Sequence, residues 1–312
     1  MINFSLIKKS LKEIKIFSGI NTVCLIGILL CMIIIEQEPK YDNRDITLKQ
    51  TIHGLFLALI PNDFVSEYIK CNSIWKPDVT NYLISNVKPG DIVVECGTNI
   101  GYYTTLLSKL VTKTGKVYAY DANSEVLQLA DLSLKMNGLS DHVILKNSCV
   151  SDKYGTTQFK FITLDPYKFI GLCNVGTSHI LASNEKKSYC LFSSYTVRDV
   201  NTVTLDSDLQ DVKQIDWLRM DIEGAEILAI QGAKRLIESS PNIKIIMEWS
   251  PRMMKQYGNV EGLIDYLFKD GFSANYIKSD GSLGKRVTKE ELLNIDLIDI
   301  VFMRNNTVVS QQ

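Results

Sequence analysis

The sequence predicts an α/β fold in which helices cover both faces of a mostly parallel sheet. From residue 89 onward, short apolar runs alternate with segments whose apolar residues have helical spacing. Strands that alternate with helices form parallel sheets, because each helix carries the chain back across one face of the sheet. The predicted strands are also apolar nearly throughout, as in Asp91–Cys96 (DIVVEC). Such runs indicate strands that are buried on both faces.

The composition is that of a large globular domain. The chain has 312 residues, of which 46% are hydrophobic and 22% are charged. This excludes a mainly disordered chain, because enough apolar surface is available to form a core. Lys and Arg total 34 against 35 for Asp and Glu, which gives a net charge of −1. The balance disfavours a broad basic face, and we expect no nucleic acid among the partners.

Seven strands and five helices can be assigned in chain order. The predicted strands are Asp91–Cys96, Lys116–Tyr120, His142–Lys146, Asp216–Met220, Lys244–Glu248, Ser273–Ile277 and Ile298–Met303. The predicted helices are Asp78–Val87, Gly101–Leu110, Ser124–Asn137, Ala225–Gln231 and Val260–Lys269. Gly138 is expected to end the third helix, because glycine readily adopts the left-handed conformation found there. Residues 151–204 are β-rich without a clear helix. The last two predicted strands lack room for a helical crossover between them, which favours an antiparallel pair.

The N-terminal region predicts a membrane anchor. Phe17–Ile35 contains 19 residues without a charge. At about 1.5 Å per residue, a helix of this length barely spans a hydrocarbon core of roughly 30 Å. The run meets Glu36 without the small residues of a signal-peptide cleavage site, which favours an uncleaved single-pass anchor. A helix buried against the domain is the alternative. Lysines flank the run on both sides, so the side of the membrane stays open.

The chain is accordingly divided into five parts. These are a basic amphipathic segment (1–16), the predicted transmembrane anchor (17–35), a connecting region (36–77), the main domain (78–304) and a tail (305–312).

The strongest motif is Val94–Gly101 (VECGTNIG), which follows a predicted strand and opens a helix. Gly97 and Gly101 allow the backbone of the turn to come close to a ligand. In open α/β sheets, ligands bind beyond the carboxyl ends of the strands, where this turn is expected. The spacing differs from the G-x-G-x-x-G pattern of dinucleotide-binding proteins. A turn with a purely structural role is the alternative.

Acidic residues follow two further predicted strands. Asp121 ends the strand VYAYD, where its carboxylate can accept two hydrogen bonds from ribose hydroxyl groups. It can equally cap the helix that follows. Asp221, Glu223 and Glu226 cluster after a later strand. Like charges this close repel one another, so the cluster indicates a functional role. A solvated loop with helix-capping acids is the alternative.

Together these motifs resemble the FkbM family of S-adenosylmethionine-dependent methyltransferases. Glu95–Thr104 (ECGTNIGYYT) resembles the family's D-V-G-A-N-I-G-Y-Y-T, and Ala119–Glu125 (AYDANSE) resembles A-F-E-P-N-P-E. The resemblance extends over about 78–304 and includes three later segments, namely Thr202–Asp206 (TVTLD), Arg219–Glu226 (RMDIEGAE) and Ile245–Glu248 (IIME). Glu95, Asp121 and Ala122 are mild departures. Arg219 stands where the family usually has Lys, which puts any amine-specific role in doubt.

The resemblance implies a Rossmann-like class I methyltransferase fold, with a mostly parallel seven-stranded sheet and S-adenosylmethionine as cofactor. It assigns Glu95, Gly97 and Gly101 to the cofactor's amino acid end, and Asp121 to its ribose. It places Ser148 and Cys149 beside the adenine, and it counts Asn99 among the cofactor-binding residues. It places Asp221 and Glu223 at the methyl group and the acceptor. It assigns no metal ligand, and the metal requirement stays open.

Family members mostly methylate hydroxyl groups of sugars, glycolipids or secondary metabolites, so the resemblance implies O-methylation by in-line transfer. Asp221 or Glu223 would take the hydroxyl proton, or bind a cation that acidifies it. The predicted anchor suits a glycan or lipid-linked acceptor. Two alternatives are kept. A membrane-anchored, metal-dependent glycosyltransferase would use the D-x-D at Asp206–Asp208, and a non-catalytic binding module would keep only the fold.

Overall fold

The computed structural model describes residues 46–163, 174–182 and 194–304. The predicted anchor (17–35), the basic segment before it and the tail (305–312) lie outside these residues, and so they stay predictions. Within the described residues, no helix is both long enough and apolar enough to cross a membrane.

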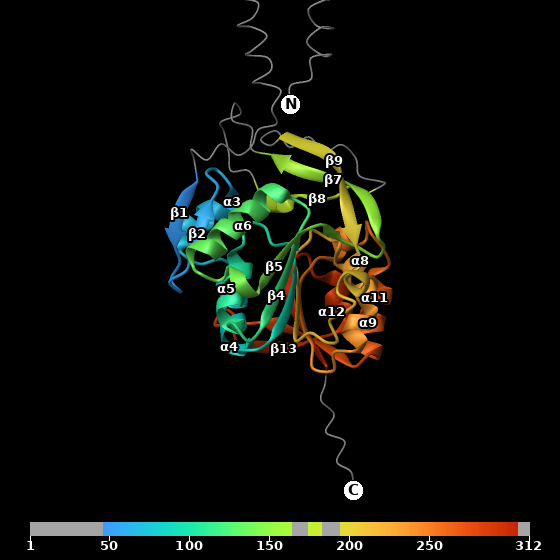
Figure 1. Ribbon diagram of the computed structural model, residues 1–312. Coiled ribbons are helices and arrows are strands. Elements are labelled where there is room, and N and C mark those ends of the chain that lie inside the picture. Colours follow the sequence, from blue (N-terminus) through green and yellow to red (C-terminus); the bar gives the residue numbers. More distant parts are fainter. Residues whose placement is uncertain (1–45, 164–173, 183–193, 305–312) are drawn as a thin grey trace, which may run out of the picture. The chain divides into compact units, whose positions relative to one another are not determined.

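A mostly parallel sheet forms the centre of the fold, as predicted (Figure 1). Its eight strands, in spatial order, are β13 (Leu283–Val287), β12 (Phe272–Ile277), β14 (Ile298–Arg304), β11 (Lys244–Trp249), β10 (Trp217–Met220), β3 (Ile92–Cys96), β4 (Lys116–Asp121) and β5 (Val143–Asn147). The strands from β11 to β5 are parallel, whereas β14 is antiparallel to both of its neighbours. All seven predicted strands are confirmed, including the antiparallel pair β12 and β14.

The eighth strand, β13, was not predicted. Within the described part of the chain it is the last strand of the sheet, beside β12, and the middle of its sequence (LGKRV) is polar and exposed. An edge strand needs no apolar side chains on both faces. The apolar runs that identified the central strands are therefore missing here.

Helices lie on both faces of the sheet, with α5 (Tyr102–Val111) and α6 (Ser124–Met136) on one side and α8 (Glu226–Gln231) and α11 (Val260–Lys269) on the other (Figure 1). These four helices and α4 (Pro77–Asn86) confirm the five predicted helices to within about two residues. The shorter helices are α7 (Leu205–Asp208), α9 (Lys234–Glu238), α10 (Pro251–Met254) and α12 (Lys289–Asn294).

The connecting region was predicted as residues 36–77, and its described part, 46–77, folds onto the domain. They form β1 (Thr47–Gln50), β2 (Phe56–Leu59) and α3 (Phe64–Asn72). Leu57 and Leu59 are fully buried, and the Ala58 N–H donates to Ser133 Oγ of α6 at 3.0 Å. The packed part of the chain therefore starts well before residue 78.

A second sheet confirms the β-rich character of residues 151–204. Its strands, in spatial order, are β6 (Cys149–Val150), β9 (Ser194–Val203), β7 (Gly155–Thr163) and β8 (His179–Ile180). The short 3₁₀ helix η3 (Val175–Thr177) precedes β8. Figure 1 shows β7, β8 and β9 grouped at one end of the central sheet.

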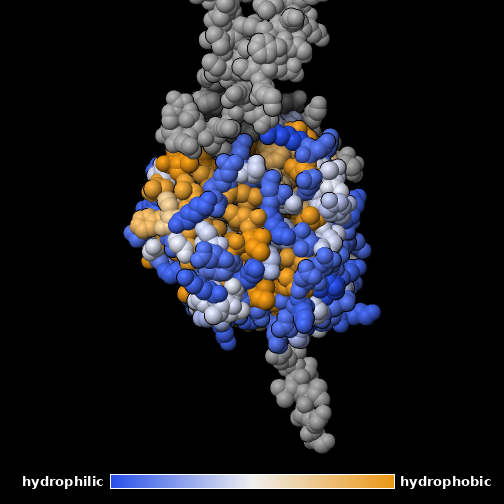
Figure 2. Space-filling view, in the orientation of Figure 1, coloured by the Kyte–Doolittle hydropathy of each residue, from blue (hydrophilic) through white to orange (hydrophobic). Residues whose placement is uncertain are grey.

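Apolar side chains also reach the surface around the first elements. Figure 2 shows an apolar area on the side of the molecule where Figure 1 places β1 and β2. Exposed apolar residues of β1, β2, α3 and the turn between the two strands are Leu48, Ile52, Phe56 and Phe64. Scattered apolar residues on a surface are ordinary, whereas a group of them indicates contact with another apolar surface.

Substitution of Gly101 tests the packing of α5 against α6. Gly101 has a φ of +85°, and a Cβ built on it would lie 2.6 Å from Ala130 Cα. We expect Gly101→Ala to lower the free energy of unfolding by about 2–4 kcal/mol, through backbone strain plus overpacking. Gly138→Ala is the matched control, because Gly138 has a φ of +66° and nothing within 4 Å of the added Cβ. It should cost only about 1 kcal/mol in urea denaturation. Equal losses would show that close packing at Gly101 contributes nothing.

Candidate active site

A cleft lies at the carboxyl ends of β3, β4, β5 and β10, where a ligand is expected in an open α/β sheet. The loops after these strands form its floor, and η3 and β8 of the second sheet contribute to its wall. Trp75 and Lys76, just before α4, line it as well.

The two predicted glycines have different roles. A Cβ on Gly97 would lie 2.0 Å from the backbone oxygen of Asp221, so the loops after β3 and β10 touch only because residue 97 has no side chain. Gly97 and Asn99 line the cleft. Gly101 is not among the lining residues, and its contact is with Ala130 of α6. The structure thus shows a role for Gly101 in helix packing, and its prediction as a cofactor-binding residue stays a prediction.

Asp121 ends β4 and lines the cleft, as predicted. Its Oδ2 accepts the Asn99 N–H at 2.8 Å, and its Oδ1 accepts the Asn123 N–H at 2.8 Å. Each oxygen of a carboxylate has two lone pairs, so each retains one for a ligand. Burial raises the pKa of Asp121 to about 6. Ser148 and Cys149, after β5, also line the cleft, so these predicted cofactor residues are brought together.

Glu95 lies beneath the cleft rather than in it. Its side chain is fully buried, and it is not among the lining residues. Thr104 Oγ1 donates to Glu95 Oε2 at 2.5 Å, and Arg219 Nη1 lies 3.4 Å from Oε1. Burial raises the pKa of Glu95 to about 7, although Arg219 opposes this rise. Both carboxylate oxygens therefore have partners within the protein, and the predicted contact of Glu95 with the cofactor stays a prediction.

Arg219 joins the two central strands. It pairs with Glu95 in the parallel register of β10 and β3, and its Nη2 lies 2.9 Å from Asp221 Oδ2. Its guanidinium also stacks 4.1 Å from the ring centroid of Tyr103. The guanidinium is planar and suited to this combination of ion pairs and stacking, which an ammonium group cannot reproduce. Arg219 therefore fixes the position of Asp221.

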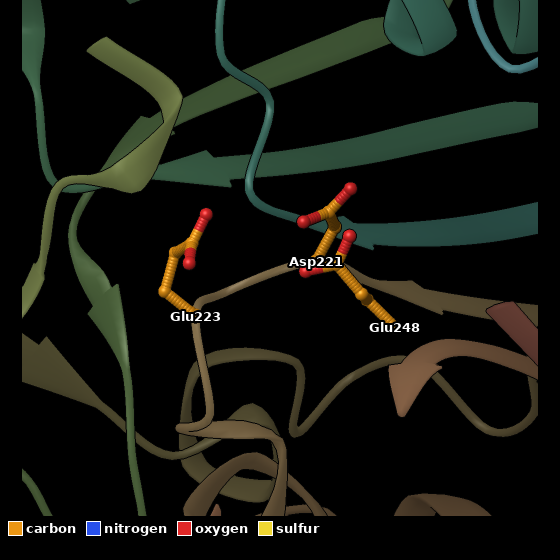
Figure 3. A group of neighbouring side chains, drawn as sticks. All are labelled: Asp221, Glu223 and Glu248. Atoms are coloured by element: carbon orange, nitrogen blue, oxygen red, sulfur yellow. The ribbon is translucent and has the colours of Figure 1, made fainter. Parts of the chain in front are cut away.

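Asp221, Glu223 and Glu248 form an acidic group at the ends of β10 and β11 (Figure 3). One oxygen of each lies within 4.8 Å of the others. Burial alone would raise the pKa of Asp221, but Lys76 and Arg219 outweigh it and lower the pKa below its usual range. Asp221 is therefore ionised and firmly held, which makes it a weak base.

Glu223 has a different environment. Among the described residues, no group makes a hydrogen bond to its carboxyl, which lines the cleft. Its backbone φ is +58°, an uncommon value for a residue with a side chain. Burial, and then the charges of Asp221 and Glu248, raise its pKa to about 9. Strained backbone and a shifted pKa are frequent at functional sites.

Sequence reasoning missed Lys76, Asp299 and the role of Glu248. Lys76 Nζ lies 2.8 Å from Glu248 Oε1 and 3.0 Å from Asp299 Oδ2. The sequence did contain a signal for Glu248, because the segment Ile245–Glu248 (IIME), which resembles a family motif, ends on this residue. Lys76 and Asp299 carry no local signal, because only the tertiary fold brings them together beside Glu248.

The D-x-D triplet is not part of the cleft. Asp206 accepts the N–H groups of Arg235 and Leu236 at the start of α9, at 2.9 and 3.0 Å. Asp208 Oδ2 accepts from Tyr120 Oη and Lys146 Nζ, each at 2.6 Å. Neither Asp206 nor Asp208 lines the cleft. The observation that favoured a glycosyltransferase is therefore explained by structural contacts.

Glu226 allows the effect of a buried carboxyl group on the stability of the protein to be tested. It is fully buried, Oε1 accepts the Ile222 N–H at 2.9 Å, and Oε2 has no hydrogen-bond partner among the described residues. Burial raises its pKa to about 8. The folded protein thus keeps this proton to a higher pH than the unfolded chain, whose Glu titrates at about 4.3. The stability that Glu226 contributes in this way is fully present below about pH 4.3. It is lost as the pH rises from there through about 8.

We therefore expect the free energy of unfolding to fall between pH 5 and pH 8, and to fall less in Glu226→Gln. The difference between the two proteins should be at most about 1.4 kcal/mol per pH unit. Urea denaturation across this range measures it. Glu238→Gln, at an exposed position of α9, is the control. A wild-type stability that rises over this range would contradict the expectation.

Comparison with known proteins connects this site to a family. Residues 95–276 match the methyltransferase FkbM domain. Among solved structures, the chain is similar to a SAM-dependent methyltransferase from Aquifex aeolicus, with 15% identity and a TM-score of 0.37 over 77% of this chain and 98% of that one. It is also similar to an rRNA methylase from Streptococcus thermophilus, with 12% identity and a TM-score of 0.37 over 72% and 93%. A SAM-dependent O-methyltransferase from Thermotoga maritima gives 14% identity and a TM-score of 0.36 over 83% and 77%.

These structural similarities are distant and indicate no substrate. The family match covers more than half of the chain, and it includes Asp121, Asp221, Glu223 and Glu248. The chain belongs to the FkbM family of S-adenosylmethionine-dependent methyltransferases.

Proposed function

We propose that the protein transfers the methyl group of S-adenosylmethionine to a hydroxyl oxygen of a glycan, glycolipid or secondary metabolite. The observation that carries this proposal is the Glu223 carboxyl, which faces the cleft without a hydrogen-bond partner among the described residues. A hydroxyl acceptor must lose a proton when it is methylated. A carboxylate whose pKa is about 9 is a much stronger base than an ordinary one.

The residues of the cleft fit the cofactor. The two oxygens of Asp121 each keep a lone pair, as the two hydroxyl groups of a ribose require. Gly97 keeps the loop after β3 free of a side chain beside Asp221. Cys149 is largely buried and offers a small apolar surface, which suits a base such as adenine. Asp121, Gly97, Ser148 and Cys149 would thus hold the cofactor.

The cofactor, when bound, supplies an electrophilic methyl group on a sulfonium that leaves as a neutral thioether. The protein's residues align the acceptor and manage its proton. Glu223, once ionised, takes the hydroxyl proton at a carboxylate oxygen. Asp221 stays ionised, because Lys76 and Arg219 lower its pKa, and it helps to orient the acceptor.

A glycan or lipid-linked acceptor is further supported by the sequence. The predicted anchor (17–35) would hold the domain beside a membrane, on a side that the sequence leaves open. The exposed apolar side chains of β1, β2 and α3 follow the anchor closely along the chain. Both features suit an acceptor that is itself part of a membrane.

The alternatives are less well supported. The acidic triplet of a glycosyltransferase is used in structural contacts away from the cleft. A non-catalytic module would have no use for Glu223, whose φ of +58° costs stability.

Cofactor binding tests the position of the site. The full-length protein should bind S-adenosylmethionine and S-adenosylhomocysteine in isothermal titration calorimetry. Asp121→Ala should weaken both by roughly 10- to 100-fold, because hydrogen bonds to a carboxylate contribute about 1.5–3 kcal/mol. Asp131→Ala, on the exposed face of α6, is the control. Equal affinity in Asp121→Ala and wild type would place the ribose elsewhere.

The base can be tested with radiolabelled S-adenosylmethionine and a panel of soluble sugars and lipid-linked glycans. We expect Glu223→Gln to lower kcat by about 10²- to 10⁴-fold, because it removes the base, while the affinity for S-adenosylhomocysteine is kept. The wild-type rate should rise with pH toward 9, since the ionised fraction of Glu223 increases. The product should be a methyl ether that survives alkali. Methyl esters or N-methyl products would refute O-methylation, and equal rates on soluble sugars would argue against a membrane-bound acceptor.

A further inference from the structure

Lys76 brings a positive charge into the acidic group of the cleft. It precedes α4, and its backbone φ is +36°. A residue with a side chain adopts this conformation only at a cost in free energy, which the surrounding structure must offset. Its Nζ lies 2.8 Å from Glu248 Oε1, 3.0 Å from Asp299 Oδ2 and 3.3 Å from Asp221 Oδ2. An ammonium group has three N–H donors, so one donor is available for each carboxylate. Burial would lower the pKa of Lys76, but these carboxylates raise it well above its ordinary value.

The sheet itself forces the three acids together. Met220 is opposite Met247 in the parallel pair β10–β11, so Asp221 follows at the level of Glu248. Glu248 is directly opposite Asp299 in the antiparallel pair β11–β14. Like charges that face each other across strands are destabilising. The register therefore favours a cation at this place.

Two kinds of cation fit. Carboxylate oxygens from Asp221, Glu223 and Glu248 that lie within 4.8 Å of one another could surround a divalent ion. The Lys76 ammonium, however, already contacts two of these three carboxylates. Lys76 and Asp299 both lie outside the family match of 95–276. A lysine from outside the family-matched part thus compensates the negative charge of Asp221 and Glu248 within it.

We propose that Lys76 is a positioning residue that takes the place of a divalent metal ion, so that this enzyme transfers methyl groups without one. The tethered ammonium holds the Asp221 and Glu248 carboxylates in place and leaves Glu223 for the acceptor. It also places a fixed positive charge near the oxygen on which negative charge develops. This inference rests on the proposed methyl transfer to a hydroxyl.

The first test needs no variant. Methyl transfer by the full-length wild-type protein should be unchanged by EDTA and by added Mg²⁺ or Mn²⁺. Activity that is lost in EDTA and restored by Mg²⁺ would overturn the proposal, because the metal would then be the required cation.

The second test uses Lys76→Met, which keeps the unbranched side chain up to the position of Cε and removes the ammonium group. Titration with Mn²⁺, followed by electron paramagnetic resonance, should show at least about tenfold tighter binding than in wild type. Lys76→Arg keeps the charge and should bind Mn²⁺ as weakly as wild type. Lys70→Met is the matched control, because Lys70 is an exposed residue of α3 whose one ion-pair partner among the described residues is Glu67. Equal Mn²⁺ affinity in Lys76→Met and wild type would overturn the proposal.

Kinetics separate positioning from a merely structural role. We expect Lys76→Met to lower kcat by about 100-fold, with unchanged affinity for S-adenosylhomocysteine. Mn²⁺ should restore part of that loss, which repair of a folding defect would not do. Full activity in Lys76→Met without metal would refute the proposal. If the wild type forms no methyl ether, the proposed function fails, whereas the Mn²⁺ titration still reports on Lys76.

Discussion

Compensation of buried negative charge is the constraint on which this site depends. The ends of β3, β10, β11 and β14 bring Glu95, Asp221, Glu248 and Asp299 to one edge of the sheet. Charges withdrawn from water are costly unless they are paired. Arg219 and Lys76 supply the pairing, one from within the sheet and one from before α4. At Glu95 burial outweighs the pairing with Arg219, so the pKa of this carboxyl is raised to about 7.

The elements outside the parallel sheet complete the cleft rather than merely enlarge the protein. Asp63 begins α3, where its Oδ2 accepts the Ser66 N–H at 2.9 Å, and its Oδ1 accepts the Val175 N–H of η3 at 3.1 Å. One buried carboxylate therefore joins the N-terminal segment to the second sheet. Tyr257 Oη donates to the Ile180 oxygen at 2.6 Å from the other side. The wall above the cofactor residues is thus fixed by side chains far apart in sequence.

The two glycines show how far a motif can be interpreted without coordinates. The sequence correctly predicted a strand, a glycine turn and a helix at Val94–Gly101. It could not separate Gly97, which permits contact with the loop after β10, from Gly101, which permits contact with α6. Both requirements are steric, and they concern atoms of other segments. Glu95 is a similar case, because a carboxyl at the end of a strand can face either the cleft or the core.

The sequence by itself determined the order and type of the central elements, because a strand buried on both faces needs an unbroken apolar run. It also determined the acids at the strand ends, Asp121, Asp221 and Glu223, since topology always places those ends at one edge. Only the tertiary structure decided that Lys76 and Asp299 join them. An ion pair requires proximity in space alone, so neither residue leaves a local pattern in the chain, and 145 residues separate Lys76 from Asp221.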